Sequence, residues 1–274
     1  MRTYNYIIVI ARYMETLEWI NDDIFKNSKL IIYNKGLDNN FTKNDNILKI
    51  INLPNVGREG HTYLYHIISN YKKNKPYITI FLPGSLDNQI KYLNAKFILE
   101  QVIKNNYTKS VFIGQILSKT KLNKVLNLSI GKTYISTNIN NANANINSDT
   151  LPTITPFKSW LIAMKLKCIN FVIFNGTFAV HRDIINSNSL NYYKKLISEL
   201  EPSIFNKQNI IKYSNPVSGH YFERCWPTIF FSDKSIYFDY KINKDVNKLI
   251  IRNNCNYIIS KIKDNYYDTH LKDI

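Results

Sequence analysis

The sequence predicts an α/β fold with a mainly parallel central sheet and helices on both faces. Short, nearly continuous apolar runs alternate with helical segments through the first hundred or so residues. The apolar runs lack the polar alternation of half-exposed strands, which is typical of parallel strands buried on both faces. Hydrophobic residues are 45% and aromatic residues 14% of the 274-residue chain, which is enough to build a full core.

Strand and helix patterns alternate in order through residue 104. Strands are expected at residues 6–10, 30–33, 47–53 and 77–82, each rich in β-branched and aromatic side chains. Helices are expected at residues 15–27, 59–72 and 91–104, where apolar side chains recur every three or four positions. Gly36, Pro54, Gly57 and the pair Pro83-Gly84 separate these elements as turns. Such alternation favours parallel strands joined by helical crossovers.

The second half is expected to decorate this sheet. A strand at 171–174, a tight turn at Asn175-Gly176 and an extended run at 178–180 follow one another. Helices are expected at 159–166, 183–200 and 218–231, and the polar, low-complexity segment 138–150 indicates a surface loop. A basic, tyrosine-rich extension over residues 232–274 is expected to add a strand at 235–240 and a C-terminal helix. We therefore expect a single domain over residues 1–231 followed by this extension.

The net charge of +16 rests mostly on lysine, because only six of the 36 basic residues are arginine. Asn, Ile, Lys, Tyr and Phe are abundant, and their codons are A/T-rich, which suggests an AT-rich genome such as that of a large DNA virus or a parasite. A nucleic-acid surface concentrates basic residues in one stripe. The lysines are spread along the whole chain instead, so nucleic acid is not the expected partner.

Membrane and redox features favour a reducing, cytoplasmic location. No apolar run approaches the roughly 20 residues of a membrane span, and the first run is expected to be a strand instead of a signal peptide. The three cysteines, Cys168, Cys225 and Cys255, are unclustered, which supports neither a disulfide framework nor a zinc site.

Chemistry-bearing residues stand at the expected strand ends and helix starts. Arg12 follows the first strand and Asp87 follows the fourth, and ligands of parallel α/β sheets bind beyond such ends. Arg58 follows a glycine turn and opens a helix, a place where backbone N–H groups and a guanidinium can bind an anion. The alternatives are a capped turn, and structural ion pairs that join Arg58 to Glu59 and Arg224 to Glu223.

Residues 218–226 gather a histidine, a carboxylate, an arginine and three aromatic rings. In a helix, His220, Glu223 and Arg224 share one face. That face suits a general base, with Tyr221 and Trp226 as stacking surfaces for a sugar or a nucleobase. The alternative is a set of core aromatics with a buried Glu–Arg pair.

Five stretches of the chain together resemble the uncharacterised family called domain of unknown function 3431, found in viruses, bacteria and fungi. They are residues 9–13 with 17–19, then 32–36, 53–67, 174–182 and 218–230. That family is similar in layout to GT-A glycosyltransferases, which place an Asn-Gly-Gly-Phe-like turn before a basic residue and an acidic helix start near the acceptor. Asn175-Gly176-Thr177-Phe178 and Glu223 stand at those places here. Pro83-Gly84-Ser85 replaces the metal-binding Asp-x-Asp, leaving Asp87 as the one carboxylate for Mn²⁺ or Mg²⁺.

The resemblance implies a GT-A-like domain that moves a sugar from a nucleotide-sugar to a glycan or other hydroxyl acceptor. The nucleotide half would span about residues 1–115 and the acceptor half about residues 150–231. We expect Glu223 or His220 to act as the base. The expected donor-binding residues are Arg12, Tyr13, Asn34, Arg58, Glu59 and Asp87, and the expected acceptor-binding residues are Tyr221, Trp226, Asn175 and Arg182. The alternative is a non-catalytic or nucleic-acid-binding basic α/β protein.

Overall fold

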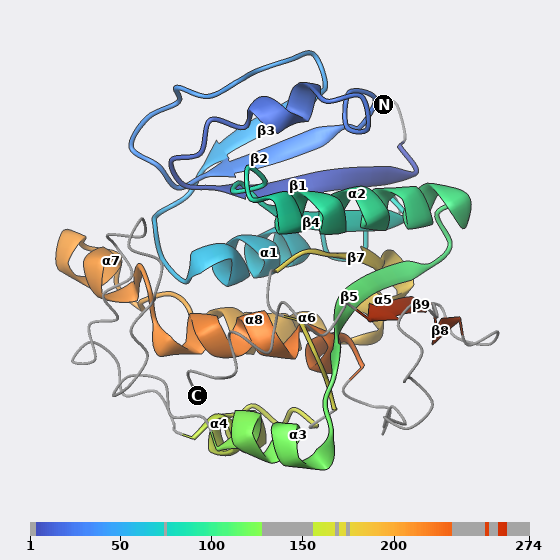
Figure 1. The fold of residues 1–274 in the computed structure, drawn as a ribbon. Helices are drawn as coiled ribbons and strands as arrows, with labels where there is room; N and C mark the ends of the chain where they lie inside the picture. Colours follow the sequence, from blue (N-terminus) through green and yellow to red (C-terminus); the bar gives the residue numbers. More distant parts are fainter. Residues whose placement is uncertain are drawn as a thin grey trace.

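The computed structural model describes residues 4–73, 76–127, 156–167, 170–173, 176–231, 250–251 and 257–261. These residues form a mixed α/β fold around one sheet (Figure 1). Across them, nine strands pair in the order β3-β2-β1-β4-β7-β5-β9-β8, with β6 paired to β5 off this path. The strands are β1 (Tyr6–Arg12), β2 (Leu30–Asn34), β3 (Ile47–Asn52), β4 (Ile78–Pro83), β5 (Ser110–Ile116), β6 (Phe171–Val172), β7 (Phe178–His181), β8 (Ile250–Ile251) and β9 (Tyr257–Lys261).

The expected parallel core is confirmed for the first four strands. β2 and β4 flank β1 in parallel register, with Ile10 opposite both Ile32 and Leu82, and β3 extends the parallel set beyond β2. β7 lies between β4 and β5 and runs antiparallel to both. The residue that follows β7 therefore lies at the opposite edge of the sheet from the residues that follow β1, β2 and β4.

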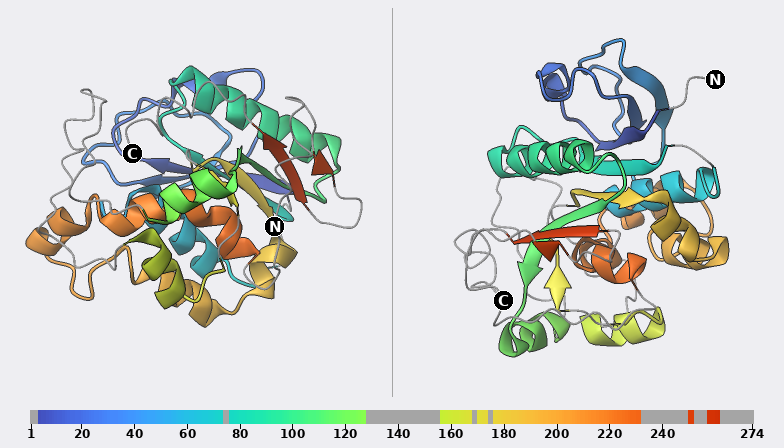
Figure 2. Two further views of the ribbon diagram at one scale, coloured as in Figure 1. Left: turned by 60° about the horizontal axis from the view of Figure 1, so that its bottom comes forward. Right: turned by 90° about the vertical axis from the view of Figure 1, so that its right-hand side faces the viewer.

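Helices cover both faces of the sheet, as the sequence predicts. The helices are η1 (a 3₁₀ helix, Glu18–Asn21), α1 (Arg58–Ser69), α2 (Gln89–Lys104), α3 (Lys119–Leu126), α4 (Phe157–Ala163), α5 (Arg182–Ser187), α6 (Leu190–Ile197), α7 (Lys207–Tyr213) and α8 (Val217–Phe230). Ile8 and Ile10 point into a core beneath η1 and α2, whereas Val9 and Ala11 point into a larger core that includes α1, α4, α6 and α8. Figure 2 shows α1 and α2 on opposite faces of the sheet.

The helix expected at residues 15–27 is wrong, because only the short η1 forms there. Leu17 takes a left-handed conformation (φ 58°), which breaks a regular helix. The Trp19 indole donates to the backbone oxygen of Gly84 (3.0 Å) and ties the segment to the end of β4. Tertiary contacts therefore override the helical spacing of the apolar residues.

Other elements go beyond the prediction. β5, α3 and α7 are not among the elements expected from the sequence. β9 pairs with β5, so part of the expected extension belongs to the sheet. In β5, Gly114 lets β6 approach, since a Cβ there would lie 2.1 Å from the Val172 carbonyl oxygen. The loop at 138–150, the strand at 235–240 and the C-terminal helix fall outside the described residues. Within the described part of the chain, the helices are all too short or too polar to cross a membrane.

Candidate active site

The carboxyl ends of β1, β2 and β4 meet at one edge of the sheet because these strands are parallel. β1 and β4 are neighbours, although the chain forms β2 and β3 between them, so the direction of travel across the sheet reverses at this pair. Open α/β sheets bind ligands in the crevice at such a reversal. Glu15 follows β1, Lys35 follows β2, and Lys91 lies in the first turn of α2 after β4. This edge is where a ligand site is expected.

A strained turn starts α1 at this edge. Gly57 and Arg58 both adopt left-handed φ angles, 62° and 52°. A Cβ on Gly57 would lie 2.6 Å from both the Cβ and the backbone oxygen of Leu200, so only glycine fits. The buried Lys35 ammonium donates to the backbone oxygens of Val56 and Arg58, both at 2.5 Å, and holds the turn. Burial lowers the pKa of Lys35 to about 7, although Glu59 opposes the shift.

The Arg58 side chain lies against the first turn of α8. Its Nη1 is 3.3 Å from Asn215 Oδ1 and 3.3 Å from His220 Nε2, and its Nε is 3.5 Å from Glu59 Oε2. Gly219 leaves room for this packing, because a Cβ there would lie 3.2 Å from Arg58 Cδ. The Arg58 side chain is 32% exposed, so the guanidinium is accessible from solvent. The structure thus brings Arg58 against the 218–226 segment.

His220 is buried and stays neutral in these surroundings. Burial lowers its pKa well below the ordinary value, and the charges of Arg58 and Arg224 lower it further. A neutral ring nitrogen can accept a hydrogen bond from Arg58. The backbone oxygen of His220 accepts one from Arg224 Nη1 (2.7 Å), the predicted i, i+4 partner. This geometry suits a residue that positions Arg58 better than it suits a base.

The pKa values of the Glu223 and Glu59 carboxyl groups shift in opposite directions in these surroundings. Burial raises the pKa of Glu223 above its ordinary value, although Arg58 and Arg224 oppose the shift. Burial also acts on Glu59, but Arg58, Lys91 and Lys35 outweigh it and hold the pKa of Glu59 below its ordinary value. Glu223 is therefore the better proton acceptor of the two near neutral pH.

Tyr63, Glu15 and Lys91 belong to the same site and were missed in the sequence. Burial raises the pKa of the Tyr63 hydroxyl, and the charges of Glu59, Glu223 and Glu15 raise it further. Within the described residues that hydroxyl has no hydrogen-bond partner. Lys91 Nζ donates to Ser85 Oγ (2.7 Å), and Glu15 Oε2 accepts the backbone N–H of Tyr13 (2.7 Å). The one signal in the sequence that could have identified Glu15 and Lys91 is their position after strands expected to be parallel.

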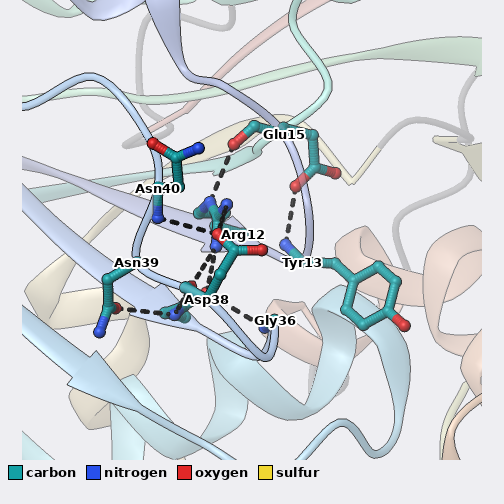
Figure 3. Close-up of polar contacts among 8 residues, drawn as sticks. Arg12, Tyr13, Glu15, Gly36, Asp38, Asn39 and Asn40 are labelled. Carbon is teal, nitrogen blue, oxygen red and sulfur yellow. Dashed lines mark hydrogen bonds and ion pairs between the residues drawn. The ribbon is translucent and has the colours of Figure 1, made fainter.

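Arg12 and Asn34 form a separate network beside the site (Figure 3). Arg12 is 1% exposed, and its guanidinium donates to Glu15 O (2.8 Å), Asn34 Oδ1 (2.6 Å), Asp38 O (2.9 Å) and Asp38 Oδ1 (2.9 Å). The guanidinium also lies 4.5 Å from the centre of the Phe41 ring. All three of its nitrogens bind protein groups, which favours a structural role. Donor binding by Arg12, Asn34 and Tyr13 stays a prediction that these contacts do not support.

The structure corrects two expectations about the acceptor. Tyr221 and Trp226 are 0% and 1% exposed, and both pack among other aromatic rings in the core, so neither has a face for a sugar. Arg182 follows the antiparallel β7 and therefore lies at the other edge, where its guanidinium is 4.5 Å from the Tyr77 ring centre. Asn175 lies outside the described residues.

The residues offer little for a divalent cation at Asp87. Its side chain is exposed in the turn before α2. Among the described residues, no three His, Cys, Asp or Glu side chains gather as metal ligands. Mg²⁺ and Mn²⁺ are often held by one or two carboxylates together with substrate phosphates. Metal binding at Asp87 stays a prediction.

Comparison with known proteins adds no relative from which to transfer a function. No family model, curated protein or solved structure matches the chain. The resemblance to the domain of unknown function 3431 and the GT-A-like layout therefore stay predictions. The function must be argued from the site itself.

Proposed function

We propose that the protein is a glycosyltransferase that moves a sugar from a nucleotide-sugar to a hydroxyl acceptor. The observation that carries this proposal is the meeting of Arg58, His220 and Glu223 at the carboxyl edge of the parallel strands. An anion-binding group thus lies beside a carboxyl group with a raised pKa, and sugar transfer from a nucleotide donor needs both.

Binding of the diphosphate is assigned to Arg58 at the start of α1. The Arg58 side chain is partly exposed, and its neighbour His220 is neutral, so the ring can accept a hydrogen bond from Arg58 and hold the guanidinium in place without repelling it. The backbone N–H groups of the first turn of α1 and the helix dipole favour an anion at the same place. Lys35 holds the strained turn that carries Arg58. Its effect on donor binding is therefore indirect, because it positions Arg58.

Proton transfer is assigned to Glu223. As the acceptor oxygen attacks the anomeric carbon, the Glu223 carboxylate takes the hydroxyl proton, and the nucleoside diphosphate leaves with the electron pair of the broken glycosidic bond. Burial places the pKa of Glu223 closer to the working range of a base than an exposed glutamate would have. The charge that develops on the departing phosphate is stabilised by Arg58.

The test is a panel of nucleotide-sugars in a thermal-shift assay, with and without Mn²⁺. At least one donor should raise the melting temperature of the wild-type protein. Arg58→Ala should weaken that binding by about 1.5–3 kcal/mol, the usual contribution of a hydrogen bond to a charged group. Arg182→Ala is the matched control at the opposite edge and should bind like wild type. If no donor raises the wild-type melting temperature, the proposal fails.

Turnover separates the base from the binding residues. Glu223→Gln keeps the shape of the side chain and should lower turnover by about 10²-fold or more with donor binding intact. Glu100→Gln, on the exposed face of α2, is the control and should turn over normally. A different outcome would favour the nucleic-acid alternative that the +16 charge leaves open. In that outcome the protein binds nucleic acid, the binding weakens steeply between about 50 and 200 mM salt, and no sugar is turned over.

A further inference from the structure

A small pocket opens at the edge of the sheet opposite the candidate active site. It lies between the last turn of α1, the start of β4 and α5, and its volume is about 30 Å³, which is room for a few water molecules or one small oxyanion. Its polar lining residues are His66, Asn70, Lys73, Thr79, Arg182 and Asn186. None of its lining residues, which all belong to the described part of the chain, is acidic. We call this cavity the α1–α5 pocket.

Arg182 provides the α1–α5 pocket with a guanidinium. The guanidinium lies 4.5 Å from the centre of the Tyr77 ring, and its Nε lies 3.6 Å from Asp183 Oδ1. Its two Nη groups make no hydrogen bond to any residue that the structure describes. The Asp183 side chain is 64% exposed, so water screens this ion pair and leaves the charge of Arg182 largely uncompensated. Arg182 can therefore bind two oxygen atoms of an anion.

Lys73 adds a second positive charge, whereas the histidine of the pocket adds none. Lys73 Nζ donates to Asn70 Oδ1 (2.9 Å), which leaves other ammonium protons for a ligand. Burial, together with the nearby charge of Lys73, lowers the pKa of His66 to about 3, so the imidazole is neutral. The charged lining residues are therefore Lys73 and Arg182, and both are positive.

Thr79 places a hydroxyl without a partner on the wall of the pocket. Its neighbours Ile78 and Ile80 point into the core beneath α2, so the Thr79 side chain points to the other face of β4, where α1 lies. Thr79 is 7% exposed, and its hydroxyl makes no hydrogen bond to a described group. A buried hydroxyl in this state is unfavourable unless a ligand or a water molecule binds it. Asn186 Oδ1 accepts the backbone N–H of Lys72 (3.3 Å), so the NH₂ group of Asn186 is a second neutral donor.

Hydrogen bonds cover the carbonyl oxygens of His66, Ile67 and Ile68 at the end of α1, which would otherwise repel an anion. The His66 oxygen accepts both the backbone N–H (3.1 Å) and the side-chain amide (2.8 Å) of Asn70. The Ile67 oxygen accepts the same backbone N–H (3.3 Å), and the Ile68 oxygen accepts the N–H of Tyr71 (3.3 Å). The negative end of the helix dipole is thus partly compensated, and the two cations decide the charge of the pocket.

We propose that the α1–α5 pocket binds a terminal phosphate group, held by Arg182, Lys73 and the Thr79 hydroxyl. A tetrahedral phosphate presents oxygen atoms in several directions, which matches donors that come from α5, from the segment after α1 and from β4. This site is separate from the start of α1 and does not rest on the proposed transferase activity. The phosphates of a nucleotide-sugar carry a substituent on both sides, so we do not expect them in so small a pocket.

Isothermal titration calorimetry with inorganic phosphate tests the site, at a constant ionic strength of about 0.15 M. Wild-type protein should bind one phosphate per chain, and planar acetate should bind about tenfold more weakly or not at all. Arg182→Gln should weaken phosphate binding about tenfold or more, because it removes charge-assisted hydrogen bonds. Glycerol phosphate is the second probe. Equal or tighter binding of this ester assigns the pocket to a phosphate ester, and weaker binding assigns it to the free ion.

A matched pair of threonine variants tests the buried hydroxyl without changing any charge. Thr79→Val keeps the shape of the side chain, so it should weaken phosphate binding about threefold to tenfold with an unchanged circular dichroism spectrum. Thr62→Val is the control, because it removes a buried hydroxyl that also lacks a partner among the described residues but lies outside the pocket. It should bind phosphate like wild type. Unchanged binding by Thr79→Val would show that the ion does not enter the pocket, and would overturn the proposal.

Further variants separate the pocket from general attraction to charge and from the candidate active site. Lys73→Gln and Lys72→Gln remove the same charge from adjacent residues, but only Lys73 lines the pocket, so only Lys73→Gln should weaken phosphate binding. Equal weakening by both, acetate binding as tight as phosphate binding, or no saturable binding by wild type would each overturn the proposal. If Arg58→Gln abolishes phosphate binding and Arg182→Gln does not, the ion binds at the start of α1. That result would overturn the pocket proposal and leave the proposed function standing.

Discussion

Replacing Arg12 by methionine should destabilise the edge of the sheet beside the candidate active site. The effect should not be limited to weaker ligand binding. Methionine keeps most of the apolar stem and removes the guanidinium. Three hydrogen bonds would be lost, to Glu15 O, Asn34 Oδ1 and Asp38 O, although Gly36 N–H still donates to Asn34 Oδ1 and Asn34 Nδ2 still donates to Asp38 O. At about 1–1.5 kcal/mol for each hydrogen bond, the loss is about 3–4.5 kcal/mol of unfolding free energy. The Asp38 carboxylate is 39% exposed, so the ion pair itself adds little to this sum.

Urea unfolding followed by circular dichroism measures this loss. Arg12→Lys should recover only a small part of it, because an ammonium cannot reproduce the fork of donors that reaches three separate acceptors. Arg182→Met is the control, since that guanidinium stacks on Tyr77 at the surface, and it should cost less than about 1 kcal/mol. If Arg12→Met unfolds like wild type but no longer binds nucleotide-sugar, the structural interpretation is refuted and Arg12 is a donor ligand.

Two further predictions concern buried polar groups of α1. Burial lowers the pKa of His66 to about 3, so the unfolded chain, with an ordinary histidine pKa of about 6.5, binds a proton that the folded chain refuses. Stability should therefore fall as pH drops from about 6.5 towards 3, by up to about 1.4 kcal/mol per pH unit. His66→Asn, which keeps an acceptor for the Tyr33 hydroxyl, should flatten that fall in urea unfolding, and parallel curves would contradict the assignment. Tyr63→Phe removes a hydroxyl with no hydrogen-bond partner in the described chain, so stability should stay equal or rise by about 1 kcal/mol. A loss of more than 1 kcal/mol in the same assay would show that the hydroxyl has a partner.

Local patterns predicted the parts of the fold that depend on local physics. β1, β2, β3 and β4 follow from continuous apolar runs, and α1 and α8 follow from helical spacing. The failed helix at 15–27 has the same spacing, but its conformation is decided by Leu17 and by a Trp19 contact sixty-five residues away. The antiparallel direction of β7 is likewise invisible in its sequence, and that direction alone places Arg182 at the wrong edge for the predicted site.

The residues of the candidate site likewise fall into those that local sequence patterns could predict and those that they could not. Arg58, Glu59, His220 and Glu223 could be proposed from a glycine turn and from residue spacing on one helix. Lys35, Tyr63 and Lys91 could not, because their roles arise where separate elements meet. From the sequence alone, a lysine after a strand is expected to be exposed to solvent. The structure shows that Lys35 is instead buried, with its ammonium group bound to two carbonyl oxygens. Arg12 is the opposite case. Its position after a strand suggested a ligand-binding role, but its guanidinium already binds Glu15, Asn34 and Asp38.

The pairing of β9 with β5 bears on how the chain folds. The register joins Ser110 to Tyr257, so the ribosome must add well over a hundred residues before β5 gains this neighbour. Closing so long a loop is slow, and until then this apolar strand offers unpaired backbone groups to any passing chain. Nascent protein should consequently depend on chaperones late in synthesis. Refolding from urea should show a slow phase that truncation before residue 250 abolishes, together with increased aggregation of the truncated chain.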